Sequence, residues 1–230
     1  TVTFSDSVVS IPSYLFNNAS ISSLYIGRSV VTIGDGAFSE CAMLKTVTFS
    51  QAIEKIGAYA FNNCVLMRNT NDFPEYVTEI GAYAFNGNYA LSSADIGNAV
   101  TEIADHAFTT CSVLSSILLP ETLKTIGDYA FQNSGLKTLT IPNNVTTIGD
   151  NCFENNKKLT SVSVGSGCSI LPTSAFAGCS LLTNVSLVDG LTSISNKAFA
   201  NCTSLTSISI PGTVTRVGTT NNSSASYLPF

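Results

Sequence analysis

Hydrophobic and polar positions recur along the chain with a period of 22 to 24 residues. Each unit carries a phenylalanine, with an isoleucine or leucine five residues before it in every unit. We call this set the Phe column; it comprises Phe16, Phe38, Phe61, Phe85, Phe108, Phe131, Phe153, Phe176 and Phe199. A period of this length, held over nearly the whole chain, is typical of a solenoid, whose stacked units bury together what one unit cannot bury alone.

The pattern between successive phenylalanines predicts two kinds of local structure. After each phenylalanine, apolar and hydroxyl residues alternate, as in residues 44–49 and 205–210, which predicts a short strand with one buried face. The Ala-Phe segment is too short for more than a 3₁₀ or one-turn helix. The glycine that follows the isoleucine in five units, for example Gly57 and Gly81, predicts a turn or a close approach of the backbone to its neighbour.

The combined pattern, Cys/Asn-x-x-Leu-x-x-φ-x-φ-Pro followed by Ile-Gly-x-x-Ala-Phe, resembles the BspA-like class of leucine-rich repeats over residues 2–217. The resemblance implies an α/β solenoid in the form of a right-handed horseshoe. Parallel β-strands would line its concave face, and short 3₁₀ or helical turns its convex face. We expect a single array over residues 1–217, with about nine to ten repeats and both ends incomplete. Residues 218–230 would be a tail or linker, or a makeshift cap.

Composition excludes several classes of function. Charged residues make up 11% of the chain, against roughly 25% in ordinary soluble domains, so Ser, Thr and Asn must cover much of the surface. The net charge is −5 and the ten basic residues are scattered, which argues against a nucleic-acid partner. No apolar run reaches the ~20 residues that span a bilayer. The sequence shows no nucleophile constellation, phosphate loop or metal cluster, so we expect neither an enzyme nor a cofactor.

Seven cysteines have positions that the repeat explains. Five lie three residues after a Phe-column residue, where other units have Asn88, Ser134 and Asn156. A small polar side chain there would serve buried backbone groups at a turn. Cys152 and Cys168 occupy core positions. The alternatives are a disulfide, Cys41–Cys64 or Cys179–Cys202, and metal binding, for which the chain has no CxxC motif.

The outward positions of the predicted strands form the candidate ligand-binding face. Hydroxyl-rich strands make a surface of low charge that suits a glycan or a flat protein epitope, although the same residues would also simply keep the strands soluble. The candidate binding residues are Arg68, Asn69, Asn71, Asp72, Ser93, Asp95, Ser116, Lys137, Thr138 and Ser161. The repeat between Met67 and Val77 is one residue too long and places a polar residue, Thr70 or Asn71, at an apolar position. Such irregularity marks either a functional site or drift in a redundant array.

A second candidate surface is a stripe of rings two residues before the Phe column, formed by Tyr59, Tyr83, His106 and Tyr129. These rings would line the convex side, either as packing between repeats or as a docking stripe. General-base catalysis by His106 has no support from neighbouring residue spacing.

The resemblance implies adhesion or protein binding at a cell surface. We therefore expect a non-enzymatic module that binds a protein or glycan and is extracellular or displayed on a cell. Asn18, Asn144 and Asn184 are candidate N-glycosylation sites in that setting. The alternative is a structural scaffold, held in a larger assembly through uncapped ends and the convex Tyr stripe.

Overall fold

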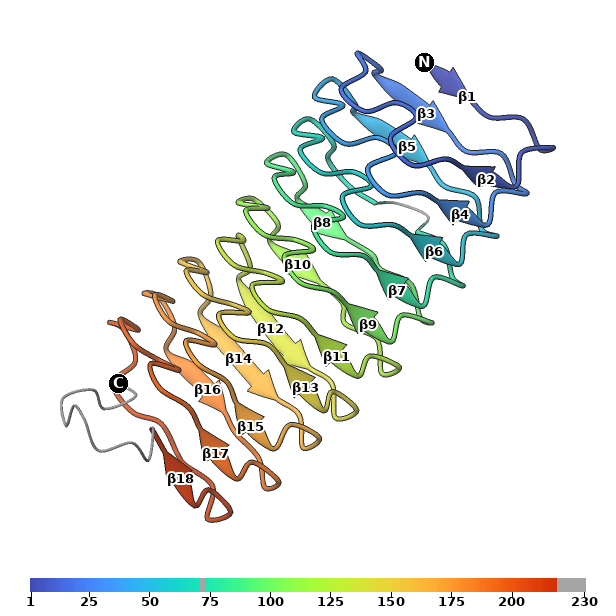
Figure 1. The fold of residues 1–230 in the computed structure, drawn as a ribbon. Helices are drawn as coiled ribbons and strands as arrows, with labels where there is room; N and C mark the ends of the chain where they lie inside the picture. Colours follow the sequence, from blue (N-terminus) through green and yellow to red (C-terminus); the bar gives the residue numbers. More distant parts are fainter. Residues whose placement is uncertain (71–72, 219–230) are drawn as a thin grey trace.

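The computed structural model describes residues 1–70 and 73–218. The chain forms a solenoid of stacked turns, and the first and last described residues lie at opposite ends of the stack (Figure 1). Each regular turn contains two short strands and one segment of tight turns. Asn71, Asp72 and the predicted tail beyond Gly218 lie outside the described residues.

The first row of strands follows the Phe column, as the alternating pattern predicts, except at residues 205–210, where the prediction was wrong and no strand forms. These first-row strands are β1 (Val2–Thr3), β3 (Ser23–Tyr25), β5 (Thr46–Thr48), β8 (Ser93–Ala94), β10 (Ser116–Ile117), β12 (Thr138–Ile141), β14 (Ser161–Val164) and β16 (Asn184–Ser186). They pair in parallel within three sheets, ordered β1-β3-β5, β8-β10 and β12-β14-β16. The parallel-strand solenoid expected from the repeat is therefore present.

A second row of strands was not predicted. It consists of β2 (Ser10–Ile11), β4 (Thr32–Ile33), β6 (Lys55–Ile56), β7 (Glu79–Ile80), β9 (Glu102–Ile103), β11 (Thr125–Ile126), β13 (Thr147–Ile148), β15 (Ile170–Leu171), β17 (Ser193–Ile194) and β18 (Arg216–Val217). Seven of them, β2 to β13, form one parallel sheet, and β15, β17 and β18 form another. Each ends on the apolar residue five positions before the Phe column, which is buried in every strand but β18.

The third side of each turn carries the Phe-column residue in a run of tight turns, and no helix occurs within residues 1–70 and 73–218. Along this segment the N–H groups donate alternately to a carbonyl of the same turn and to a carbonyl of the next turn. The N–H of Asn62 donates to the carbonyl of Tyr59 at 3.1 Å, whereas the N–H of Phe61 donates to the carbonyl of Ala84 at 2.8 Å. This alternation replaces the short 3₁₀ or helical turns expected from the sequence.

Backbone geometry explains why a helix does not form. In each of the nine units, the residues two before and two after the phenylalanine have positive φ, near +60° in most cases. A right-handed helix needs consecutive negative φ angles. These residues are Tyr14 and Asn18, Gly36 and Glu40, Tyr59 and Asn63, Tyr83 and Gly87, His106 and Thr110, Tyr129 and Asn133, Asn151 and Asn155, Ser174 and Gly178, and Lys197 and Asn201.

The Phe column forms the centre of the core. Successive rings stack with centroids 5.2 to 5.8 Å apart and planes within 13° of parallel, from Phe16 to Phe199. Every member from Phe38 to Phe199 is at most 2% exposed, whereas Phe16, in the first turn, is half-buried. The stack is therefore continuous along the axis of the solenoid.

Thr110 should be a strained residue in this backbone, because a β-branched side chain is a rare occupant of positive φ. Its φ is 60°, and asparagine, which tolerates this region, has the equivalent position at Asn63 and Asn133. We expect Thr110→Asn to raise the free energy of unfolding by about 0.5–1 kcal/mol, measured by urea denaturation. Asn133→Thr is the matched control and should lower it, since Asn133 has a φ of 55°. A loss of stability in Thr110→Asn would contradict the assignment of strain.

Candidate functional site

Two rows of hydroxyl side chains occupy the face of the first-row strands. The residues of one row come directly before the strands in the sequence and bond to the backbone of the preceding turn. The hydroxyl of Ser115 donates to the carbonyl of Ser92 at 3.1 Å, and that of Thr160 donates to the carbonyl of Lys137 at 3.1 Å. Ser92 and Thr183 make the same contact with the preceding turn. These hydroxyls therefore tie successive turns together.

The other row lies one residue further along and consists of Ser93, Ser116, Thr138 and Ser161, which we call the free hydroxyl row. Ser93 pairs with Ser116, and Thr138 pairs with Ser161, in parallel register. The first three are exposed and Ser161 is half-buried. Within the described part of the chain their hydroxyls make no hydrogen bond. Their donors and acceptors are therefore available to a ligand.

The other predicted binding residues lie around this row. Asn69 forms an isolated parallel bridge with Ser93, and Arg68 and Lys137 are exposed beside the strands. Asp95 is exposed one residue after β8. Asn71 and Asp72 lie outside the described residues. The structure thus brings Asn69, Ser93 and Ser116 together on adjacent turns.

The irregular repeat interrupts the first row of strands. Thr70 takes the position of an apolar strand residue and is 1% exposed. Its hydroxyl donates to the carbonyl of Asp95 at 2.8 Å and accepts the N–H of Asp95 at 3.0 Å. One side chain thus makes the two hydrogen bonds that a backbone ladder would otherwise make with Asp95. Because the hydroxyl is bonded as donor and as acceptor, its burial costs little free energy. Phe73 restores the core register, with its ring 5.6 Å from that of Phe49 and 6.3 Å from that of Phe85.

A hollow of about 680 Å³ adjoins this repeat, and we call it the corner hollow because it lies where turns pass from first-row to second-row strands. It is lined by Gln51, Phe73, Glu75, Tyr76, Asp95, Gly97 and Asn98. Tyr76 is 62% exposed. Among the predicted binding residues that the structure describes, only Asp95 lines it. Gln51, Gly97 and Asn98 were missed because they belong to regular neighbouring turns, and only the one-residue insertion signalled the place.

The predicted stripe of rings exists as a continuous outer stack. Ring centroids are 4.7 Å apart for Tyr59 and Tyr83, 4.4 Å for Tyr83 and His106, and 4.8 Å for His106 and Tyr129, with planes within 9° of parallel. Burial lowers the pKa of His106 from its ordinary value, while the carboxylates of Asp105 and Asp128 act in the opposite direction. The faces of these rings are used in packing between turns.

All seven cysteines are buried free thiols, so neither alternative disulfide is present. Each of the five that follow the Phe column donates to the carbonyl of the phenylalanine one turn earlier, as do Asn88, Ser134 and Asn156, at 2.8 to 3.4 Å. Burial raises the pKa of Cys111 to about 12 and that of Cys202 to about 11. These side chains therefore serve as structural donors.

The candidate glycosylation sites differ in their surroundings. Asn18 is exposed and has a φ of 59°. Asn144 is exposed, but its side-chain amide donates to the carbonyl of Glu121 at 2.7 Å. Asn184 is exposed in β16, beside Ser161. All three remain predictions.

Residues 1–70 and 73–218 contain no group of three or more His, Cys, Asp or Glu side chains that could hold a metal ion. Within the same residues there is no helix of the length and apolarity needed to cross a membrane. Three features of the described chain are candidates for ligand binding: the free hydroxyl row, the corner hollow and the outer stack.

Stacked parallel strands, a continuous Phe column and a Cys/Asn position that bonds to the preceding turn define a repeat protein of the leucine-rich class. The chain belongs to the family of BspA-type leucine-rich repeat proteins. The model of that family's repeat region matches in six copies, over residues 1–91, 44–160 and 101–228. No curated protein matches the sequence.

Several solved structures of bacterial leucine-rich repeat proteins are similar to this chain. The crystal structure of a leucine-rich repeat protein from T. pallidum has a TM-score of 0.63 and 24% identity, over 85% of this chain and 82% of that one. A leucine-rich repeat protein from Bacteroides ovatus has a TM-score of 0.46 and 22% identity, over 92% and 78% of the two chains. The pneumococcal vaccine antigen PcpA has a TM-score of 0.42 and 22% identity, over 91% and 65%. At this identity the T. pallidum structure supports the fold alone.

His106 should make stability depend on pH. Because its pKa in the folded chain lies below the ordinary value of 6.5, the unfolded chain binds the proton more tightly and stability falls as the pH drops below that value. Tyrosine fits this position in three neighbouring turns. We expect the melting temperature of His106→Tyr to rise relative to that of the parent as the pH is lowered from about 7.5 to about 5. A fall of the variant relative to the parent would show that the effect of Asp105 and Asp128 on the pKa outweighs that of burial.

The cysteines should be unreactive in the folded chain. With a pKa of about 12 for Cys111, its thiolate fraction at about pH 8 is on the order of one in ten thousand. We expect iodoacetamide to modify few thiols in the native protein and all seven cysteines in urea without reductant, counted by intact mass. Fewer than seven in urea would reveal a disulfide.

Proposed function

We propose that this chain is a non-enzymatic binding module that holds a protein or a glycan against the face of its first-row strands. The observation that carries the proposal is the free hydroxyl row, in which Ser93, Ser116 and Thr138 are exposed with unused donors and acceptors among the described residues. The adjacent hydroxyls of Ser92, Ser115 and Thr160 already bond to the backbone. A ligand can therefore use the first set without weakening the fold.

The chemistry of this face suits recognition of uncharged polar groups. Serine and threonine hydroxyls each offer one donor and two acceptors, and parallel register repeats them from turn to turn. We propose that this is the concave face of a horseshoe. We also propose that the module is extracellular or displayed on a cell, because the family resemblance implies such a role.

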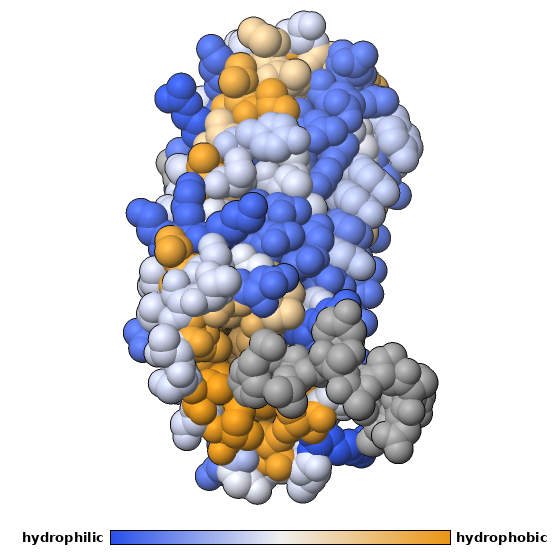
Figure 2. Space-filling model, turned by 90° about the vertical axis from the view of Figure 1, so that its left-hand side faces the viewer, coloured by the Kyte–Doolittle hydropathy of each residue, from blue (hydrophilic) through white to orange (hydrophobic). Residues whose placement is uncertain are grey.

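A structural scaffold is the second candidate, and the ends of the stack favour it. Val217 is 51% exposed, whereas Ile194, at the same position one turn earlier, is 1% exposed. Figure 2, which views the molecule from the left-hand side of Figure 1, shows hydrophobic side chains gathered at the end where the last turns lie. Burial of such surface, or of the edge of the outer stack, would hold the chain in an assembly.

Arginine substitutions on the strand face should block ligand binding without unfolding the chain, because a long charged side chain would cover the hydroxyls. We expect Ser116→Arg and Thr138→Arg each to reduce, by about tenfold or more, the binding of the chain to its strongest partners on printed peptide and glycan arrays. Melting temperature should change little, since both positions are exposed.

Thr147→Arg is the matched control, because Thr147 is an exposed strand residue of the second row in the same part of the stack. It should leave array binding unchanged. Equal losses in all three variants would contradict a site on the first-row face. No array binding, together with concentration-dependent oligomers by light scattering, would favour the scaffold.

A further inference from the structure

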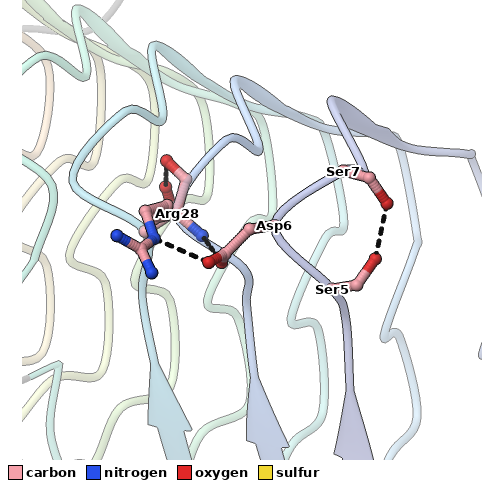
Figure 3. A network of polar contacts seen from close by, with 5 residues as sticks. Ser5, Asp6, Ser7 and Arg28 are labelled. Atoms are coloured by element: carbon pink, nitrogen blue, oxygen red, sulfur yellow. Dashed lines mark hydrogen bonds and ion pairs between the residues drawn. The ribbon is translucent and has the colours of Figure 1, made fainter.

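The corner turns show how this solenoid binds a guanidinium group. Asp6 and Arg28 occupy the same position of successive corner turns, and their side chains meet in Figure 3. One carboxylate oxygen of Asp6 accepts the backbone N–H of Arg28 at 2.9 Å, and the other accepts its side-chain Nε at 2.6 Å. A corner carboxylate on one turn can thus hold an arginine that approaches from the next.

Glu75 occupies the corner position equivalent to that of Asp6, but its surroundings differ. The next turn has Asn98 at this position instead of an arginine. Glu75 is exposed, and it makes no hydrogen bond or ion pair with the rest of the described chain. Asp6 thus has a cationic partner from its own chain. The carboxylate of Glu75 faces the corner hollow and has no cationic partner among the described residues.

The other residues of the corner hollow also suit a cation. Tyr76 follows Glu75 and is 62% exposed, at a position where other corner turns have Ser, Ala, Asn, Thr or Gly. Asp95 contributes a second carboxylate, of which one oxygen accepts the N–H of Gly97 at 3.1 Å. Among the described residues that line the hollow there is no lysine or arginine. An aromatic face beside carboxylates that have no cationic partner among the described residues attracts a cationic side chain by charge and by cation–π contact.

We propose that the corner hollow binds an arginine side chain of a protein partner, with the guanidinium on the carboxylate of Glu75 and against the ring of Tyr76. This inference rests on the proposed function, because the hollow adjoins β8 and would anchor one end of a ligand that lies along the strand face. It narrows the partner to a protein with an exposed arginine. A glycan would leave the two carboxylates of the hollow without a counter-ion.

The probe is the blocked peptide acetyl-Gly-Arg-Gly-Arg-Gly-amide, titrated into the isotopically labelled protein at low ionic strength and followed by amide chemical shifts. We expect saturable shifts at corner turns 74–76 and 97–99. Glu75→Gln and Tyr76→Leu should each weaken binding about two- to fivefold, as expected for an exposed ion pair or cation–π contact. Both side chains are exposed, so melting temperature should be retained.

Two controls keep the test specific. The same peptide with citrulline in place of arginine has the shape of the probe without its charge, and it should not bind. Glu121→Gln removes a carboxylate from the same position two corner turns later, where threonine follows instead of tyrosine, and it should leave affinity unchanged. Binding of the citrulline peptide, an equal loss in Glu121→Gln and Glu75→Gln, or no saturable shift would each overturn the proposal.

The test separates this inference from the function on which it rests. If Ser116→Arg abolishes array binding while the arginine peptide fails to bind, the strand face is the ligand site and the corner hollow is not. If the peptide binds in the hollow but Ser116→Arg and Thr138→Arg leave array binding unchanged, the hollow binds arginine and the strand-face proposal is wrong.

Discussion

Each turn of this protein must lie within contact distance of the next along all three of its sides, and the rest of the structure follows from that spacing. Phe-column rings stack 5.2 to 5.8 Å apart, and backbone groups pair between turns in both rows of strands and in the tight turns. A Cβ on Gly81 would lie 2.7 Å from the backbone nitrogen of Ala58, so glycine is required there. No turn is stable by itself, since its buried face is completed by its neighbours.

Because each turn depends only on its neighbours, the stack tolerates one irregular turn. The extra residue between Met67 and Val77 breaks the first row of strands, yet Thr70 bonds to both backbone groups of Asp95 and Phe73 returns to the core. Contacts between nearest neighbours confine the disturbance to the adjoining turns. Its consequence is on the surface, where the corner hollow opens beside Tyr76.

Sequence alone predicted the features that the period controls directly. The Phe column, the first-row strands, the donors at the Cys/Asn position and the outer stack each correspond to one residue type at one position of the repeat. The second row was missed because the apolar residues at its strands are three positions apart, as Val30 and Ile33 are, and so show no alternation. The tight turns were missed because the first position of positive φ carries residues such as Tyr59 and Lys197, which give no signal, although Asn or Gly occupies the second such position in seven of nine units. The corner hollow depends on three turns at once, so no single repeat predicts it.

Regularity also shows where a ligand can bind, because most polar groups already hold neighbouring turns together. Ser115 and Ser116 differ by one position, yet the first bonds to the carbonyl of Ser92 and the second points outward without a partner among the described residues. Asp6 and Glu75 differ in the same way, since only Asp6 receives an arginine from the next turn. In a solenoid, residue type at a given position therefore indicates function poorly. The informative positions are those whose exposed polar groups make no contact with a neighbouring turn.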